Sequence, residues 1–468
     1  MRSFVLVPEA LVVGGAVALL LIGRFGGIQR SQRRNLPALV VALVLIALVV
    51  ELWAGATLSS FFGGALVQDR FALFAKAAAL LAAVTAIAVT DWSAEDSLSV
   101  GLAMPLLAAF GVMVAASAGD LVGLWAGLEV AAAAGVVLVS LRRPDLGLRL
   151  LVVGGVATAL LLVGLAFVYA TTGSADLESV RRMMYAAAPT LPLAIPVLLL
   201  LGGLAVRASL APFQFAGVAG SLGASPLGAG LVLGLVAVAG LTATIKIAGA
   251  LSPLPALFTP YLEVLAAVAM VGGGACALAT RSPRARLAYL ATGEVGWVAA
   301  GLVTHYRAGL GASLFLVGAF AVAATCGPAV MGGLEGGESS LAGMGALRPA
   351  RAAGIAMAFL SLAGAPPLAG FFGEFAVGAA LAQSSHFGLL SLGLLGSVMS
   401  LAAALATLRV IYIQSPQEEG RRGVTLPVWT RFSTAGAVAL CVVIAAYGVF
   451  GSPILGLAYQ GAEALGLR

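Results

Sequence analysis

The chain has 468 residues, of which 61% are hydrophobic and only 9% are charged, with a mean hydropathy of +1.09. A soluble domain carries roughly a quarter charged residues, so this composition excludes a soluble enzyme. The net charge of +6 comes mostly from arginine and indicates membrane topology, not nucleic-acid binding.

Fourteen apolar runs follow one another, and most reach the roughly 20 residues that a membrane-spanning helix needs. The sequence therefore predicts an all-α polytopic membrane protein of about 14 transmembrane helices. The expected spans are residues 4–23, 36–54, 70–90, 97–116, 120–141, 147–170, 190–211, 228–250, 258–280, 286–304, 308–332, 352–381, 388–413 and 432–456.

Arginines gather in the links that follow odd-numbered spans, which by the positive-inside rule places those links in the cytoplasm and both termini outside. They are Arg24, Arg30, Arg33, Arg34, Arg142, Arg143, Arg149, Arg281, Arg284, Arg286, Arg348, Arg351, Arg421, Arg422 and Arg431.

Two spans contain prolines that predict a helix break, because proline lacks a backbone donor and clashes with the preceding turn. Pro212 lies in VRASLAPFQF of span 7, and Pro366 and Pro367 lie in SLAGAPPLAGFFGEF of span 12. Breaks five spans apart fit two inverted five-helix repeats, spans 4–8 and spans 9–13, as in many ion-moving membrane proteins. The alternative is two packing kinks. The expected units are residues 1–96, 97–251, 252–414 and 415–468.

One carboxylate, Glu129, lies near the middle of span 5, where a charge costs on the order of 3 kcal/mol. It is either a proton-binding group or a permanently protonated residue that bonds two helices. Arg207, just before the first break, is its expected cationic partner; a guanidinium stays charged and can tune a proton site without being one.

Four other ionisable residues in the spans are candidates for a proton pathway. Glu374 follows the second break, Glu294 lies midway along span 10, Lys76 lies in span 3 and Lys246 lies toward the end of span 8. For the two lysines, snorkelling of the ammonium to the membrane surface is the alternative. The cysteines and the two histidines show no metal-ligand spacing, so neither a metal site nor a cofactor site is expected.

Five stretches resemble subunit N of bacterial NADH–quinone oxidoreductase, an antiporter-type membrane subunit of respiratory complex I. They are ASAGDLVGLWAGLEV, VYATTGSADLESV, LAVRASLAPFQF, RARLAYLATGEVGW and LSLAGAPPLAGFFGEF, in that order. The resemblance covers nearly the whole chain. It implies proton translocation in a prokaryotic plasma membrane, coupled to redox chemistry that other membrane-arm and peripheral-arm subunits perform with flavin, iron–sulfur clusters and quinone.

Within that resemblance, Glu129 matches the family glutamate of span 5. Arg207 occupies the position of a lysine in span 7, Ala237 the position of a lysine in span 8, and Lys246 matches a basic position at the end of that helix. Glu374 replaces a lysine and Glu294 replaces a histidine. The sequence is thus a divergent member, and two alternatives stay open. One is a subunit of a cation/proton antiporter or membrane-bound hydrogenase-type complex; the other is a structural subunit that has lost its own proton path.

Overall fold

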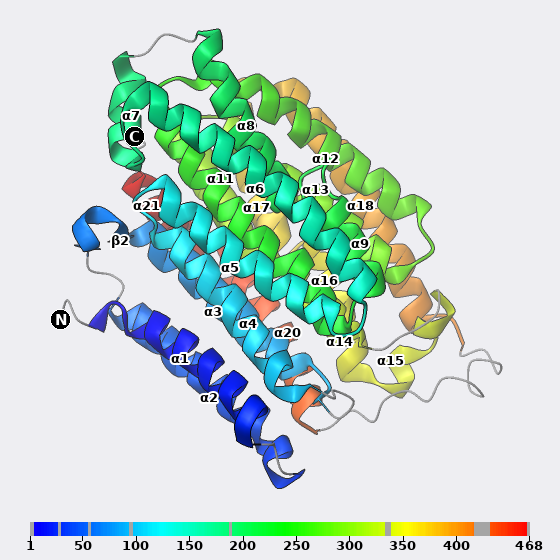
Figure 1. Ribbon diagram of the computed structural model, residues 1–468. Coiled ribbons are helices and arrows are strands. Elements are labelled where there is room, and N and C mark those ends of the chain that lie inside the picture. The colour runs from blue at the N-terminus through cyan, green and yellow to red at the C-terminus, as the bar shows by residue number, and fades with distance from the viewer. Residues whose placement is uncertain are drawn as a thin grey trace.

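The computed structural model describes residues 4–26, 30–54, 58–92, 97–186, 190–332, 338–415 and 431–465. Long helices run side by side in a single bundle (Figure 1), which confirms the predicted all-α membrane fold. The only strands in these ranges form a short hairpin, in which β1 (Ser59–Phe61) pairs antiparallel with β2 (Leu66–Gln68) around the turn η3 (Phe62–Gly64). The loop arginines Arg421 and Arg422 lie outside the described residues.

Four helices form the N-terminal part of the bundle. They are α1 (Val7–Leu21) with its continuation η2 (Ile22–Gly26), α2 (Arg30–Ala54), α3 (Arg70–Val89) and α4 (Leu98–Ser117). The helices α1 and α2 lie as a pair along one side of the bundle (Figure 1), where α1 packs on α4 and α2 packs on α3.

The next helices correspond to predicted spans 5–8. They are α5 (Leu121–Ser140), α6 (Pro144–Thr172), the surface helix α7 (Leu177–Ala186), α8 (Leu191–Arg207), α9 (Phe215–Gly223), α10 (Pro226–Gly230), the π-helical turn η5 (Leu231–Val236) and α11 (Ala237–Leu251). The pair α8 and α9 replaces one continuous span 7, and α10, η5 and α11 together make span 8.

The remaining elements correspond to predicted spans 9–14. They are η6 (Pro255–Leu257), α12 (Thr259–Ala279), α13 (Pro283–Val303), α14 (Arg307–Met331), η7 (Glu338–Leu341), α15 (Met344–Leu347), α16 (Pro349–Leu362), α17 (Ala369–Gln383), α18 (Phe387–Tyr412), α20 (Arg431–Val449) and α21 (Gly451–Ala464). The predicted last span differs from the structure, which divides it into α20 and α21. Pro453 explains this division, because it lacks the N–H that would bond the carbonyl of Val449.

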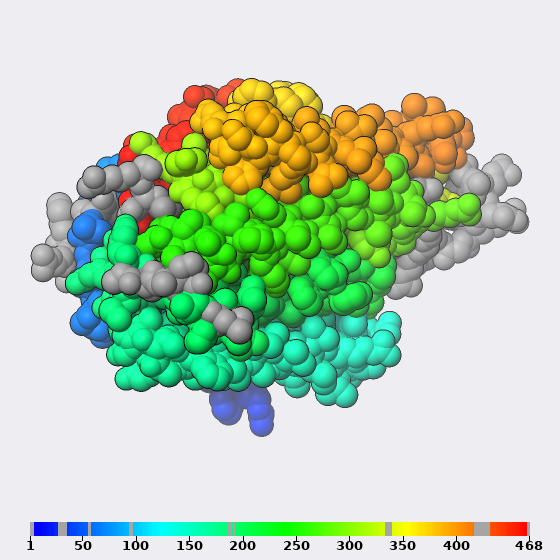
Figure 2. Space-filling view, turned by 90° about the horizontal axis from the view of Figure 1, so that it is seen from above, coloured from blue at the N-terminus to red at the C-terminus, as the bar shows by residue number. Residues whose placement is uncertain are grey.

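Eleven helices in the described ranges are long and apolar enough to cross a membrane. The other predicted spans are α13, which carries Arg286 and Glu294, and the two spans that breaks divide into shorter helices. Figure 2 shows α6 in teal and α18 in orange at opposite edges of one face, with green helices between them. The apolar part of α14 is completely buried inside the chain, so the core of the bundle lies around α14.

The two helix breaks have the same backbone geometry, 155 residues apart. In the first, Leu210 N bonds Ala205 O at 2.9 Å, Ser209 has a positive φ of 56°, and the Ala211–Pro212 peptide is cis. In the second, Ala365 N bonds Leu360 O at 2.9 Å, Gly364 has φ of 65°, and the Pro366–Pro367 peptide is cis. Both predicted breaks are confirmed.

Two of the arginines counted in the topology argument are buried and bond the ends of helices. Arg286 donates to Ala277 O at 3.1 Å and Thr280 O at 2.7 Å, at the C-terminus of α12. Arg351 donates to Val330 O at 2.9 Å and also to Met331 O, at the C-terminus of α14. A cation there satisfies orphan carbonyls and complements the negative end of the helix dipole.

Candidate functional site

The predicted partners Glu129 and Arg207 are in direct contact. Arg207 is the last residue of α8, directly before the first break, and its Nη2 donates to Glu129 Oε1 on α5. Thr158 on α6 lies between them: its hydroxyl donates to Glu129 Oε1 at 2.6 Å and accepts from Arg207 Nη2 at 2.8 Å. Sequence reasoning missed Thr158, because a threonine in an apolar helix gives no signal before the helices are packed.

The two charges of this pair are buried to different extents. The Arg207 side chain is 6% exposed, whereas the Glu129 side chain is 33% exposed at the surface of the isolated chain. Arg207 Nε is buried and has no hydrogen-bond partner among the described residues. A permanently charged guanidinium with an unused donor favours a carboxylate or a polarised water beside it.

Two cavities lie on one side of the Glu129–Arg207 pair, toward the end of the bundle that holds the links after odd-numbered spans. The larger, about 500 Å³, is lined by Arg142, Arg143 and Arg284. The smaller, about 40 Å³, borders Arg207 itself. A water needs only about 10–15 Å³ in this kind of measure, so the smaller cavity has room for one or more waters.

An apolar cluster borders both cavities. We call it the apolar barrier; it consists of Val139, Leu146, Leu150, Ala224, Ala229 and Val232. Ala224 lines the larger cavity, and Leu150 and Val232 line the smaller one. Buried hydrocarbon of one cluster therefore lines part of both cavities.

Lys246 is buried and does not snorkel. It lies on α11 with a side chain that donates to Ala118 O at 2.5 Å, in the link between α4 and α5. Its ammonium also lies 5.7 Å from the centre of the Phe71 ring on α3. Lys246 thus connects the α4–α5 link, at the bundle end away from the two cavities, to α3 of the N-terminal helices.

The second half contains two buried carboxyl groups and no such ion pair among the described residues. Glu294 on α13 is 1% exposed, and neither of its carboxyl oxygens has a hydrogen-bond partner among these residues. Glu374 on α17 accepts from Ser397 Oγ at 2.6 Å, and Ser397 in turn accepts from Trp297 Nε1 at 2.9 Å. Glu294 and Glu374 interact electrostatically, so two predicted residues are brought together around the second break.

Lys76 belongs to a separate polar network in the N-terminal helices. Its ammonium contacts Glu9 on α1 and donates to Gln68 Oε1 at 2.6 Å, and Gln68 Nε2 donates to Glu51 Oε1 on α2 at 2.8 Å. Glu51 was not predicted, because it lies at the end of its span and resembles a membrane-surface residue. The sequence did contain a signal. Because consecutive spans run in opposite directions, Glu9, Glu51 and Lys76 are all expected near the same side of the membrane.

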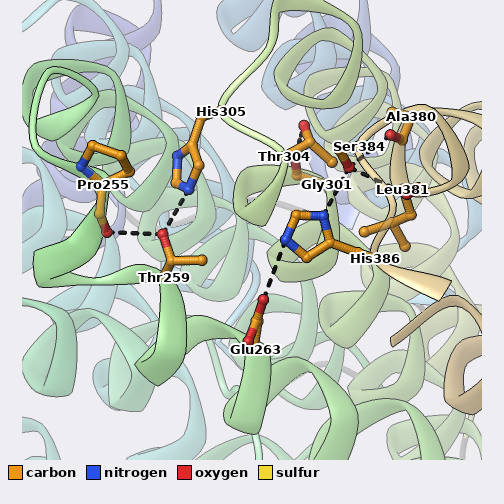
Figure 3. A network of polar contacts seen from close by, with 10 residues as sticks. All are labelled: Pro255, Thr259, Glu263, Gly301, Thr304, His305, Ala380, Leu381, Ser384 and His386. Atoms are coloured by element: carbon orange, nitrogen blue, oxygen red, sulfur yellow. Dashed lines mark hydrogen bonds and ion pairs between the residues drawn. The ribbon is translucent and has the colours of Figure 1, made fainter. Parts of the chain in front are cut away.

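The two histidines are neighbours in a polar cluster at the bundle end opposite the larger cavity (Figure 3). His305, in the link between α13 and α14, bonds Thr259 Oγ1 at 2.6 Å, and Thr259 donates to Pro255 O. His386 lies 3.3 Å from Glu263 and 2.9 Å from Ser384 Oγ. No group of three or more potential metal ligands occurs in the described parts of the chain.

The hydroxyl groups that contact the two imidazole rings show which ring nitrogens carry a hydrogen. Thr259 gives its proton to Pro255 O, so His305 Nε2 carries the hydrogen of their shared bond. Ser384 gives its proton to Ala380 O, so His386 Nδ1 also donates. On the other side of the ring, Nε2 of His386 faces the Glu263 carboxylate.

We predict that His305 makes the folded chain sensitive to acid. Burial, together with the neighbouring His386, lowers the pKa of His305 from 6.5 to about 4. Because the unfolded chain binds this proton first as the pH falls, stability is full above pH 6.5 and decreases between about pH 6.5 and 4. His305→Asn removes the titration and keeps a residue that tolerates the positive φ of 58°.

The measurement is the thermal unfolding midpoint of the purified protein between pH 7 and pH 4. His305→Asn is expected to lose less stability than the wild type across this interval, whatever its stability at pH 7. Parallel curves for the two proteins would contradict the assignment.

Known proteins resemble this chain in sequence and in structure. Residues 118–400 match the family described as NADH:quinone oxidoreductase/Mrp antiporter, TM. NADH-quinone oxidoreductase subunit N 1 of Rhizobium meliloti is 28% identical over 96% of this chain and 94% of the relative. Subunit N of Azorhizobium caulinodans is 30% identical over 79% and 80%, respectively.

A solved structure agrees with these relatives. One chain of respiratory complex I from Thermus thermophilus with bound aureothin superposes with a TM-score of 0.81 at 25% identity, over 97% of this chain and 99% of that chain. The chain belongs to the NADH:quinone oxidoreductase/Mrp antiporter membrane family and, within it, to NADH-quinone oxidoreductase subunit N.

Proposed function

We propose that this chain is a proton-translocating, antiporter-like subunit of a complex I-type NADH–quinone oxidoreductase. The observation that carries the proposal is the Glu129–Arg207 contact directly before a helix break. A proton can reside on Glu129, whereas Arg207 keeps its charge at any physiological pH. Movement of Arg207 toward or away from Glu129 would therefore change how tightly the carboxylate binds a proton.

The cavities suggest how protons reach this pair. In this proposal the larger cavity is an entry vestibule, and the smaller cavity has room for water beside Arg207. The apolar barrier between them prevents a permanent leak, because hydrophobic constrictions block conduction by excluding water. Coupled transport then requires the barrier to become wet only in one state of the cycle.

Further transfer uses the remaining buried groups. Lys246 holds a proton at the end of α11, while Glu294 and Glu374 form a two-carboxyl site around the second break. Two carboxyl groups in one buried site share a proton more readily than they both ionise. Lys76 belongs to the network of the N-terminal helices and is a secondary candidate for this path.

The same residues support an assembly with partner subunits. Glu129 is partly exposed midway along α5, and α6, whose Thr158 bonds Glu129, exposes Leu151, Val152 and Val156. A carboxylate facing lipid at this depth is costly, so a neighbouring protein subunit is the expected cover. Flavin, iron–sulfur clusters and quinone belong to such partners, and this chain performs no redox step.

The topology proposal follows from the arginine distribution. We place both termini on the outer side of a prokaryotic plasma membrane. The arginine-lined cavity then faces the cytoplasm, and the histidine cluster faces the outer side. Residues 97–251 and 252–414 form two inverted halves, preceded by the N-terminal helices and followed by the C-terminal helices, residues 415–468. The matching breaks around Pro212 and Pro367 support this division.

Two alternative functions are compatible with the same fold. The family also includes Mrp antiporters, so a cation/proton exchange complex without NADH chemistry has the same fold. A structural subunit that has lost its own path is supported by Ala237, which is fully buried and offers no titratable group in the chain between Arg207 and Lys246.

Glu129→Gln tests the proposed function. The complex that contains this chain would be reconstituted into vesicles, and NADH-driven proton uptake into the vesicle lumen would be measured with a pH-sensitive dye. Glutamine keeps the shape but binds no proton, so we expect proton translocation to fall at least about tenfold, in line with the loss of an acid–base group.

The matched control is Glu178→Gln, which changes an exposed glutamate on α7 that pairs with Arg181. It should translocate protons like the wild type. Unchanged translocation in Glu129→Gln would support a structural role for the ion pair, and uptake driven by a sodium gradient without NADH would support the antiporter alternative.

A second prediction concerns the apolar barrier. Val232→Thr replaces a methyl group with a hydroxyl between the two cavities, which favours water there. We expect a faster passive decay of a pH gradient across vesicles that contain the complex, without NADH. Val238→Thr is the control, because Val238 is also buried on the same span and lines neither cavity. Equal decay for both variants would contradict a gating role.

A further inference from the structure

A second group of buried ionisable residues lies in the first three helices, outside the region that matches the family model. Glu9 is in the first turn of α1, Glu51 in the last turn of α2, and Lys76 in the second turn of α3. Gln68 ends β2 and lies among them. Lys76 and Glu51 are fully buried, Gln68 is 2% exposed, and the Glu9 side chain is 13% exposed.

Only one assignment of donors and acceptors fits the hydrogen bonds of this group. Lysine can only donate, so Gln68 must present its carbonyl oxygen to Lys76. The amide nitrogen of Gln68 then faces Glu51 and donates to Oε1. Gln68 therefore transmits the position of the Lys76 charge to Glu51 through its amide group.

The charges of the group do not balance if every member is ionised. Two carboxylates face one ammonium, and the charged groups that act on Glu51 are Lys76 and Glu9. Glu9 contacts Lys76 directly, so it is the carboxylate that this cation neutralises. Oε2 of Glu51 is buried and has no hydrogen-bond partner in the described part of the chain. A buried carboxyl without a countercharge is far cheaper to keep neutral than ionised.

The group is connected to the first half of the bundle. In β2, Leu66 bridges Ala118, whose carbonyl accepts the bond from Lys246. Phe71, which packs beneath the Lys246 ammonium, lies on α3 five residues before Lys76. Lys76 and Lys246 also interact electrostatically. A change of charge at Glu51 would thus reach Lys246 through the hairpin and through α3.

We propose that Glu9, Glu51, Gln68 and Lys76 form a proton-binding site in the N-terminal helices, which exchanges one proton with water at the bundle end where Glu9 is partly exposed. Glu51 holds the proton, Lys76 and Glu9 form the charged pair, and Gln68 joins them. The site goes beyond the proposed path through Glu129 and does not depend on it.

Infrared spectroscopy of the vesicle-reconstituted complex tests this site, because a protonated carboxyl has a carbonyl band of its own. We expect this band to lose the intensity of one carboxyl in Glu51→Gln, and to be unchanged in Glu178→Gln, which alters an exposed glutamate. In heavy water the band should shift, since the proton exchanges with the solvent. An identical band in wild type and Glu51→Gln, or no isotope shift, would overturn the proposal.

Lys76→Met provides an independent test. Without the cation, both carboxyl groups lack a countercharge, so the protonated band should gain the intensity of one further carboxyl. No gain would contradict the charge balance on which the site depends. Normal proton translocation in Glu129→Gln would contradict the proposed pathway but would not change either infrared result. Failure of the pathway and failure of this site are therefore distinguishable.

Discussion

A helix that breaks inside a bilayer leaves backbone amides and carbonyls that lipid cannot satisfy, and this constraint explains much of the structure. At both breaks the chain solves it in the same way: a residue with positive φ, Ser209 or Gly364, turns the backbone so that the next amide bonds a carbonyl five residues earlier. The buried helix α14 and its neighbours cover the rest. Broken helices so enclosed also create polar sites where ionisable groups can be held at membrane depth.

The chain uses its two equivalent breaks differently. In the first half, the charge precedes the break: Arg207 ends α8 and meets Glu129. In the second, the charge follows the break, where Glu374 on α17 interacts with Glu294 and no arginine or lysine bonds either carboxyl group within the described residues. The first site therefore places a carboxylate beside a fixed cation, and the second holds two carboxyl groups that interact with each other. In the path that we propose, one backbone arrangement would thus support two kinds of proton site.

Sequence reasoning found what depends on local pattern and missed what depends on packing. The helix class, both breaks and the partnership of Glu129 with Arg207 follow from composition, proline positions and the rarity of charge in a span. Thr158 and Glu51 could not be found in this way, because a threonine or a carboxylate near a helix end becomes informative only when another helix supplies its partner. The two histidines are isolated in the sequence for the same reason: 80 residues of chain lie between His305 and His386, and only packing brings the two links together.

The measurement that tests the central claim most directly is the number of protons translocated per NADH when Arg207 is changed. Arg207→Lys keeps a cation beside Glu129, and Arg207→Leu removes it. If Glu129 binds a proton under the control of Arg207, the lysine variant retains most of the wild-type ratio. The leucine variant then has a lower ratio, because the cation that favours the ionised form of this carboxylate is gone. A wild-type ratio in Arg207→Leu would contradict the account and leave the pair as a structural contact between α5 and α8.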